Sequence, residues 1–288
     1  MKKEVAVTCY IDNNINTIDE FRWLYNSWLK SGSWLMSDIV AFHHPQIQEF
    51  MLPKDNNITY IPLMPHIEKY PEWNNYSFIN SIGYLTEPEA KALAKYKYIL
   101  RTDCDCFLTP YFSTLKPRLT MFGAGQYASE PDVAIKLMSI AKEWGIKPAF
   151  NNIGSTVFGE TQWVLIYSSI HLEYCKRLSE EAFKDGNGVW PGWYRGVLSM
   201  YAGQLAAQSY FGLAMTIGGL DVHCVAHEDI SPQDYHIHAW HSFDHFSKFK
   251  WRKGEYVDYD MGKVDKTKIA DYCLWIAGFG RQPEGEIF

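Results

Sequence analysis

The sequence predicts a globular α/β protein, built on a mostly parallel sheet with helices on both faces. Apolar runs typical of strands alternate with amphipathic helical stretches over the first hundred residues. Of the 288 residues, 47% are hydrophobic and 21% are charged, as expected for a chain with a full core. No repeat, linker or low-complexity segment divides the sequence. We therefore expect a single domain over residues 1–288.

The first predicted element is a strand from Val5 to Ile11, which ends in the polar residues Asp12, Asn13 and Asn14. A helix follows and stops near Gly32. Its apolar residues recur at helical spacing: Ile18, Phe21, Leu24, Trp28 and Leu29. Two more strands (38–44 and 58–63) precede helical stretches at 76–85 and 87–97 and a strand, Tyr96–Leu100.

The second half is less regular. Residues 150–159 predict a turn that feeds a strand, because glycines occur where the backbone must approach a neighbour closely. An amphipathic helix is expected at 171–186, an aromatic Pro/Gly-rich loop at 188–196 and an apolar helix at 197–212.

Composition excludes several classes of protein. The net charge is −6 and no Lys/Arg cluster stands out, so a nucleic-acid partner is not expected. No stretch is long and apolar enough to span a membrane, and the N-terminal apolar run lacks a small-residue cleavage site. The six cysteines are scattered, which favours reduced thiols. We expect a soluble cytoplasmic protein, or one domain of a longer one.

Two aspartates, Asp103 and Asp105, follow the strand Tyr96–Leu100. On a continuing strand the two carboxylates would share a face and repel each other, unless a cation lay between them. Mg²⁺ and Mn²⁺ commonly take one or two carboxylates together with phosphate oxygens of a substrate. Two charges at a solvated strand end are the alternative. The position after a buried strand of a parallel sheet, where ligands collect, favours a metal site.

The segment YILRTDCDCFLTP (98–110) resembles the Asp-x-Asp segment of nucleotide-sugar-dependent glycosyltransferases with the GT-A fold. CYIDNN (9–14) matches the place where that family contacts the nucleoside. FNNIGSTVFG (150–159) is similar to a Phe-Asn-(Ser/Ala)-Gly-Val-Leu turn of the retaining, glycogenin-like and galactosyltransferase-like branch. IHAWHSFDHFSKFKW (237–251) is similar to its late His-aromatic…Lys-Pro-Trp segment, although the proline is missing here.

The resemblance implies a Rossmann-like GT-A fold, with the donor nucleotide bound by about residues 1–125, acceptor and catalytic groups in about 126–260, and a tail at 261–288. It implies a hexosyltransferase that moves galactose or glucose from a UDP-sugar to a glycan hydroxyl, with Mn²⁺ (or Mg²⁺) as cofactor. Retention of configuration is slightly favoured over inversion. Asp103 and Asp105 would hold the metal on the diphosphate, and His238 would complete its shell.

Seven residues are expected to contact the nucleotide: Cys9, Tyr10, Asp12, Asn13, Arg101, Asp103 and Lys248. Tyr10 could stack on the base or belong to the core. Asp12 or Asn13 could bond the base edge or the ribose. Arg101 could hold the diphosphate or form a structural ion pair, and Lys248 could assist the leaving group or be a surface lysine.

Residues expected at the donor or acceptor sugar are Asn80, Ser81, Asn151, Asn152, Gly154, Trp190, Trp193 and Tyr194. The aromatic loop could stack on an acceptor sugar or pack under a lid. An inverting enzyme needs a general base, and Glu228 and Asp229 are the best acidic pair for it. In a retaining enzyme, Gln204 could lie beneath the anomeric carbon.

The histidines leave two other functions open. His236, His238 and His241 could hold zinc in a hydrolase, but Trp240 occupies the position where the His-x-His-x-Asp-His pattern needs an acidic residue. At least two of the histidines around 236–245 are expected to be surface or core-edge residues. The third possibility is a non-catalytic carbohydrate-binding module that uses the Trp-rich loop.

Overall fold

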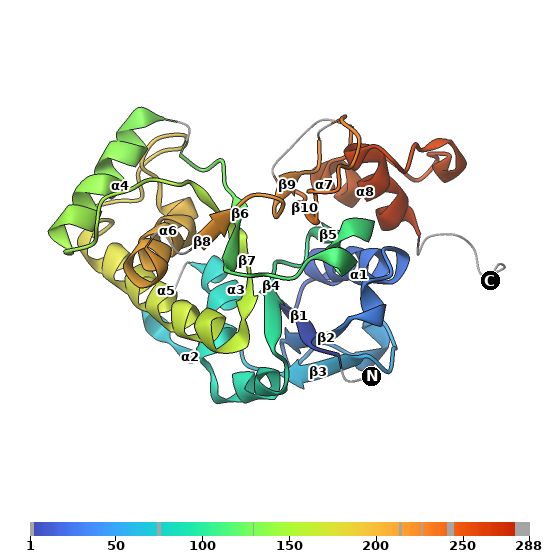
Figure 1. Cartoon of the computed structure of the whole chain (residues 1–288), viewed down its shortest axis with the longest axis horizontal. Coiled ribbons are helices and arrows are strands. Elements are labelled where there is room, and N and C mark those ends of the chain that lie inside the picture. The colour runs from blue at the N-terminus through green and yellow to red at the C-terminus, as the bar shows by residue number, and fades with distance from the viewer. Residues whose placement is uncertain are drawn as a thin grey trace.

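The computed structural model describes residues 3–73, 76–128, 130–212, 215–225, 227–240 and 245–279. Seven strands form a central sheet in the order β3-β2-β1-β4-β7-β6-β8 (Figure 1). Neighbouring strands are parallel, except that β7 is antiparallel to both β4 and β6. The α/β fold with a mostly parallel sheet is therefore confirmed. The strands are β1 Val5–Ile11, β2 Ser37–His43, β3 Ile58–Pro62, β4 Tyr98–Arg101, β6 Thr120–Ala124, β7 Ile153–Glu160 and β8 Met215–Ile217.

A second, three-stranded sheet has the order β5-β10-β9 and consists of β5 Cys106–Leu108, β10 His236–His238 and β9 Val222–His223. The helices are α1 Ile15–Lys30, α2 His66–Lys69, α3 Asn80–Gly83, α4 Pro131–Glu143, α5 Thr161–Glu181, α6 Leu198–Phe211, α7 Lys248–Arg252 and α8 Ile269–Gly278. Short 3-10 helices occur at Ser33–Leu35, Glu49–Met51, Pro71–Trp73, Ser77–Ile79, Tyr84–Thr86, Pro88–Lys95, Pro110–Thr114, Arg195–Val197 and Met261–Lys263. Within the described ranges, no helix has the length and apolarity needed to cross a bilayer.

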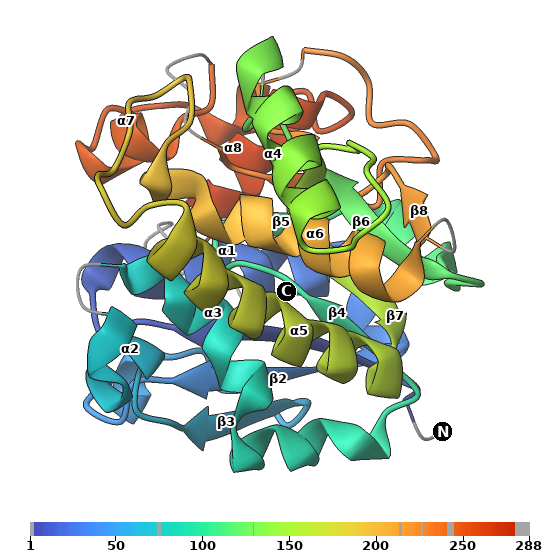
Figure 2. The same cartoon turned by 90° about the vertical axis from the view of Figure 1, so that its left-hand side faces the viewer.

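Helices cover both faces of the central sheet (Figures 1 and 2). Helix α1 packs on one face, where Phe21 and Trp28 join Val7 and Cys9 of β1 in one apolar cluster. Helices α5 and α6 cover the opposite face, where residues such as Val164 pack against Tyr10 and Val40 and their neighbours. Because successive strand residues point to opposite faces, β1 contributes to both clusters and all seven of its residues are buried.

The predicted helices at 76–85 and 87–97 are shorter and less regular than expected. The first is divided into Ser77–Ile79, α3 and Tyr84–Thr86, and the second is the 3-10 helix Pro88–Lys95. Gly83 lies at the end of α3, and a Cβ there would come within 2.3 Å of the His66 ring. Gly83, a residue of low helix propensity, thus packs closely on His66 where α3 ends.

The strand order of the central sheet changes direction between β1 and β4. From β1 the sheet continues to β2 and β3 on one side, and β4 lies on the other side. Ligands of open α/β sheets bind where the strand order changes direction in this way. Asp12 follows β1, and residues 102–105 follow β4. The predicted residues Asp12, Asn13, Asp103 and Asp105 therefore follow strands at this edge.

Asp221 is a buried carboxylate that lies against two neighbouring strands. A Cβ on Gly123 of β6 would come within 1.9 Å of its Oδ2, and a Cβ on Gly154 of β7 within 2.1 Å. The β6–β7 register also shifts between Phe122 and Ala124, at Gly123. Glycine is required at both positions because Asp221, only 1% exposed, occupies the space of a side chain.

Gly154→Ala should reduce the free energy of unfolding by about 1–3 kcal/mol, because the new methyl group overlaps a fixed carboxylate. Gly262→Ala is the matched control, since its Cβ would meet only the side chain of Asp260, at 3.1 Å. Urea unfolding midpoints measure both effects. Equal midpoints for the two variants would show that Asp221 moves aside freely.

His171 of α5 predicts a pH dependence of stability. Burial lowers its pKa from 6.5 to about 3, and its Nε2 donates to the Ser199 carbonyl at 2.6 Å. The unfolded chain therefore binds more protons between pH 6.5 and 3, and stability falls as the pH falls through that window. The loss is up to about 1.4 kcal/mol per pH unit. His171→Gln should flatten this slope in urea unfolding at pH 7 and pH 5; parallel losses would contradict it.

Candidate functional site

Asp103 and Asp105 lie in a turn and not on a strand, which corrects the expectation that they share one strand face. Strand β4 ends at Arg101 and β5 begins at Cys106. Asp103 Oδ1 accepts a hydrogen bond from Arg101 Nη2 at 3.1 Å. Asp105 faces other partners, so each carboxylate is paired with a basic side chain of its own and no cation shared between the two is needed to offset their repulsion.

Asp105 is buried between two basic side chains. Lys248 Nζ lies 2.5 Å from its Oδ2, and His238 Nε2 lies 3.3 Å from its Oδ1. Burial alone would raise the pKa of the Asp105 carboxyl, but Lys248 and His238 outweigh burial and hold that pKa far below its ordinary value. The carboxylate is therefore ionised at neutral pH.

Lys248 also ties α7 to the rest of the site. Burial opposes its charge, but Asp105 and Glu20 of α1 raise the pKa of its ammonium. Arg252, at the other end of α7, places Nη2 2.5 Å from Glu20 Oε1. Burial, followed by the nearby Asp105 charge, raises the pKa of Glu20 to about 7. Two ion pairs thus anchor α7, and the predicted Lys248 is a partly buried residue of the site.

His238 lies between two carboxylates. Its Nε2 faces Asp105, and its Nδ1 lies 3.2 Å from Asp221 Oδ1. Burial alone would lower the pKa of the imidazole. The charges and hydrogen bonds of Asp105 and then Asp221 outweigh burial and raise that pKa to about 10. Burial likewise raises the pKa of Asp221, whereas His238 lowers it to about 2. A charged imidazolium with both N–H groups bonded satisfies both acids.

His236 has both ring nitrogens in use. The backbone N–H of Asp221 donates to Nδ1 at 3.1 Å, so Nε2 carries the proton and donates to Thr102 Oγ1 at 2.7 Å. The ring is fully buried, and burial lowers its pKa to about 4. His236 is therefore neutral in this structure. With Cys106 and Asp221 it also forms a group whose ligand atoms lie within 4.8 Å of one another and could hold a metal ion, so its role in zinc binding stays a prediction. The third expected zinc residue, His241, lies outside the described residues.

We call Asp105, Asp221, His236, His238 and Lys248 the carboxylate–histidine cluster. Ligand atoms of Asp105, Cys106 and His238 lie within 4.8 Å of one another, so this part of the cluster could hold a metal ion. A carboxylate oxygen and an imidazole nitrogen suit Mn²⁺. Burial raises the pKa of Cys106 well above its ordinary value, so its sulfur is a neutral thiol and a weak ligand. The donor set fits a cation held by Asp105 and His238.

A second network joins the ends of β1 and β4 through α3. Asn80 Nδ2 donates to Asp12 Oδ1 at 2.8 Å, and Ser81 Oγ accepts from Arg101 Nη2 at 2.9 Å. Arg101 also donates to the Ser81 and Ser155 carbonyls and to Asp103. Its guanidinium is buried, and although burial alone would lower its pKa, the Asp103 charge raises it.

This network changes the expected role of Asn80. Asn80 is 3% exposed and positions Asp12, so it is not placed to contact a sugar. Burial raises the pKa of Asp12, while the Asn80 hydrogen bond opposes the rise. Asn13 is exposed and donates to Gln46 Oε1 at 3.3 Å. Asp12 and Asn13 remain the two predicted nucleotide residues of the β1 end with accessible side chains.

Cys9 and Tyr10 belong to the core, which is the alternative given above for Tyr10 and corrects the expected nucleotide contact of Cys9. Cys9 is fully buried under α1. Tyr10 is 5% exposed, its hydroxyl donates to the Leu63 carbonyl at 2.8 Å, and its ring packs on Tyr84. The sequence pattern does not show which face of the sheet a residue of β1 points to, and both faces of this strand are covered.

The turn before β7 is held from α6 by Gln204. Gln204 is fully buried, and its Oε1 accepts from the backbone N–H groups of Asn151 (3.3 Å) and Ile153 (3.4 Å). Asn152 adopts a positive φ of 48°. Within the described part of the chain, Gln204 Nε2 and Asn152 Oδ1 have no hydrogen-bond partner. Gln204 thus shapes the turn, and Gly154 makes room for Asp221.

The aromatic loop is divided between packing and exposure. Trp193 stacks on Phe183 (4.9 Å) and Tyr201 (4.4 Å), with Lys136 over its ring. The backbone N–H of Tyr194 donates to the Tyr201 hydroxyl at 3.4 Å. Trp190, in contrast, is 49% exposed. Trp193 therefore has a packing role, and Trp190 is the expected tryptophan with a ring open to a ligand.

Glu228 and Asp229 are exposed. Lys268 Nζ lies 2.7 Å from Asp229 Oδ1, and the Glu228 carbonyl accepts from the backbone N–H of Ile269, at the start of α8. These contacts show a surface role that joins the 227–230 segment to α8. The structure does not place either acid in the carboxylate–histidine cluster, contrary to the expectation for a catalytic base.

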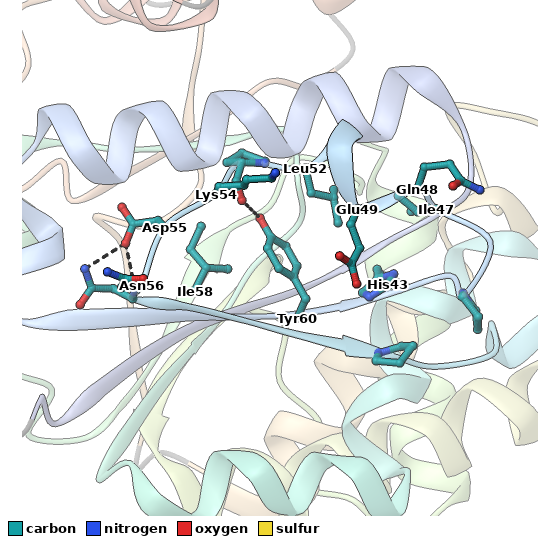
Figure 3. A pocket seen from close by; sticks show the side chains of 14 residues that line it. His43, Ile47, Gln48, Glu49, Leu52, Lys54, Asp55, Asn56, Ile58 and Tyr60 are labelled. Carbon is teal, nitrogen blue, oxygen red and sulfur yellow. Dashed lines mark hydrogen bonds between the residues drawn. The ribbon is translucent and has the colours of Figure 1, made fainter. Parts of the chain in front are cut away.

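A pocket of about 1110 Å³ lies at the β3 edge of the sheet, between β3 and the segment that connects it to β2 (Figure 3). Tyr60 closes that segment over β3 by donating to the Pro53 carbonyl at 2.7 Å, and Asp55 accepts from Asn57. The cluster residues do not line this pocket. The connection that covers this edge strand contains the short 3-10 helix Glu49–Met51, and Glu49 lines the pocket.

A search among curated proteins gave no match to the chain. A family model described as "Domain of unknown function (DUF7164)" matches residues 1–274. The match runs from β1 into the first half of α8 and includes both networks and the whole carboxylate–histidine cluster. The chain belongs to the DUF7164 family.

Proposed function

We propose that this chain is a metal-dependent glycosyltransferase of the GT-A type that transfers a hexose from a UDP-sugar to a glycan hydroxyl. The single observation that carries the proposal is Asp105, a buried carboxylate between β4 and β5 that faces both an imidazole nitrogen and an ammonium group. This combination provides a cation ligand pair, Asp105 and His238, beside a positive charge, Lys248. A sugar diphosphate with a bound metal ion needs both.

The residues that follow β1 and β4, together with His238 and Lys248, have separate roles in the proposed reaction. Asp12 and Asn13 bind the nucleoside at the β1 end, and Asp105 with His238 holds Mn²⁺. When bound, the cation supplies stabilisation for the charge that develops on the leaving diphosphate. Lys248, which is bonded to Asp105 in this structure, is placed to share its charge with the phosphate oxygens. Arg101 fixes Asp103 beside them.

The proposal keeps retention of configuration. An inverting reaction needs a carboxylate base near the acceptor, and both acids expected for that role lie exposed beside α8. Trp190 is the exposed aromatic side chain best suited to an acceptor sugar. The six cysteines are all free and buried, which suits a reducing compartment, and we place the protein in the cytoplasm.

Asp105→Asn should weaken binding of UDP in the presence of Mn²⁺ at least about tenfold, or about 1.4 kcal/mol. The variant removes the carboxylate charge that the cation requires, while binding of UDP without Mn²⁺ should change little. Isothermal titration calorimetry with and without Mn²⁺ measures both. Asp229→Asn is the matched control, because it removes one carboxylate charge from the surface. Unchanged Mn²⁺-dependent binding in Asp105→Asn would reject the assigned site.

A screen of UDP-hexoses tests the reaction itself. We expect slow hydrolysis of one donor that requires Mn²⁺ and stops in Asp105→Asn, because water can replace an absent acceptor. Release of UDP gives the readout, and metal analysis of the purified protein separates the alternatives. Tight stoichiometric zinc without donor hydrolysis would favour a zinc hydrolase. Glycan binding that needs neither metal nor nucleotide would favour a carbohydrate-binding module.

A further inference from the structure

We propose that Asp221 is a positioning residue, which fixes the ring of His238 so that Nε2 is the nitrogen presented to the cation. The inference rests on the metal site proposed above and adds the residue that selects the ligand atom. Asp221 lies far from Asp105 in the sequence, in the segment GGLDVH (218–223), and no motif marks it.

The two carboxylates bind opposite nitrogens of one ring. Asp221 Oδ1 lies 3.2 Å from Nδ1, and Asp105 Oδ1 lies 3.3 Å from Nε2. A carboxylate can only accept a hydrogen bond, so the nitrogen beside Asp221 must carry a proton. Without a metal ion, Nε2 also donates, to Asp105. A cation that binds beside Asp105 replaces that proton, so Nε2 offers its lone pair while Nδ1 keeps its proton on Asp221. Metal-bound histidines are commonly oriented by a carboxylate in this way.

Asp221 cannot turn away from this position. The backbone N–H of Thr156 donates to Oδ2 at 2.9 Å, and the Thr156 hydroxyl donates to Oδ1 at 2.6 Å. Gly123 and Gly154 leave space that the carboxylate fills. The residue itself has a positive φ of 57°, in the left-handed region that few side chains other than Asn and Asp adopt. The fold thus builds a fixed acceptor behind the His238 ring.

Asp221→Asn should reverse the ring's protonation while keeping the shape of the site. The Thr156 backbone N–H can only donate, so the new amide must turn its oxygen to Thr156 and its NH₂ group toward His238. Nδ1 must then accept, which places the remaining proton on Nε2, where it blocks the cation. The substitution is nearly isosteric, and the second-shell loss expected for a metal site is about 10–100-fold in affinity.

The test uses the whole chain with Mn²⁺ alone, titrated by electron paramagnetic resonance. Asp221→Asn should bind Mn²⁺ about 10–100-fold more weakly than the wild type, and Asp229→Asn should bind it equally well. Urea unfolding of each variant separates lost folding from lost affinity. In parallel, ¹⁵N NMR of the wild-type imidazoles with Zn²⁺, a diamagnetic probe, should show His238 protonated at Nδ1 and metal-bound at Nε2.

Each outcome decides the inference. Metal bound through Nδ1, or a folded Asp221→Asn variant with wild-type Mn²⁺ affinity, overturns the role of Asp221 but leaves the proposed function standing. A wild-type protein that binds neither Mn²⁺ nor Zn²⁺ overturns both. If Asp221→Asn does not fold, the NMR assignment of the wild-type ring decides alone.

Discussion

A buried carboxylate keeps its charge only where opposite charges and hydrogen-bond donors replace the water it has lost, and Asp105 is such a group. Its two compensating cations come from distant parts of the chain, His238 on β10 and Lys248 on α7. β10 is paired with β5, directly after Asp105, and α7 is held to α1 through Arg252 and Glu20. The ion pairs that neutralise this one charge therefore hold the small sheet and α7 at the end of β4.

The early part of the fold could be predicted from the sequence because its signals are local. β1, β2, β3 and α1 occur close to their expected bounds, since apolar runs end in turn residues and Asn14 caps α1 by accepting from the Thr17 N–H. The predicted helix at 76–85 is shorter in the structure, where α3 ends at Gly83 and this glycine packs against the His66 ring. Nothing in a window of neighbouring residues reports such a contact, and for the same reason the pattern showed β1 but not that Tyr10 faces the core.

The site was accessible to sequence reasoning only where its residues follow strands. Asp12, Arg101, Asp103 and Asp105 lie at strand ends of the sheet, and His238 was expected beside Asp105. Asp221 was missed because its importance comes from partners far away in the chain, Thr156 and His238, and from a positive φ. Charge alone also misled: Glu228 and Asp229 form a conspicuous acidic pair, yet they are exposed and the cluster excludes them.

Asp221 packs against β6 and β7, and each of these strands has a glycine where it contacts the acid. Positions 123, 154 and 221 are therefore coupled in space, although the first and last lie far apart in the sequence. A relative with a larger residue at either glycine has no room for the acid, and a relative without the acid has a void to fill between β6 and β7. Sequences of this family should therefore vary at these three positions together. A relative that differs at only one of them should be one in which the histidine at 238 has lost its original partner.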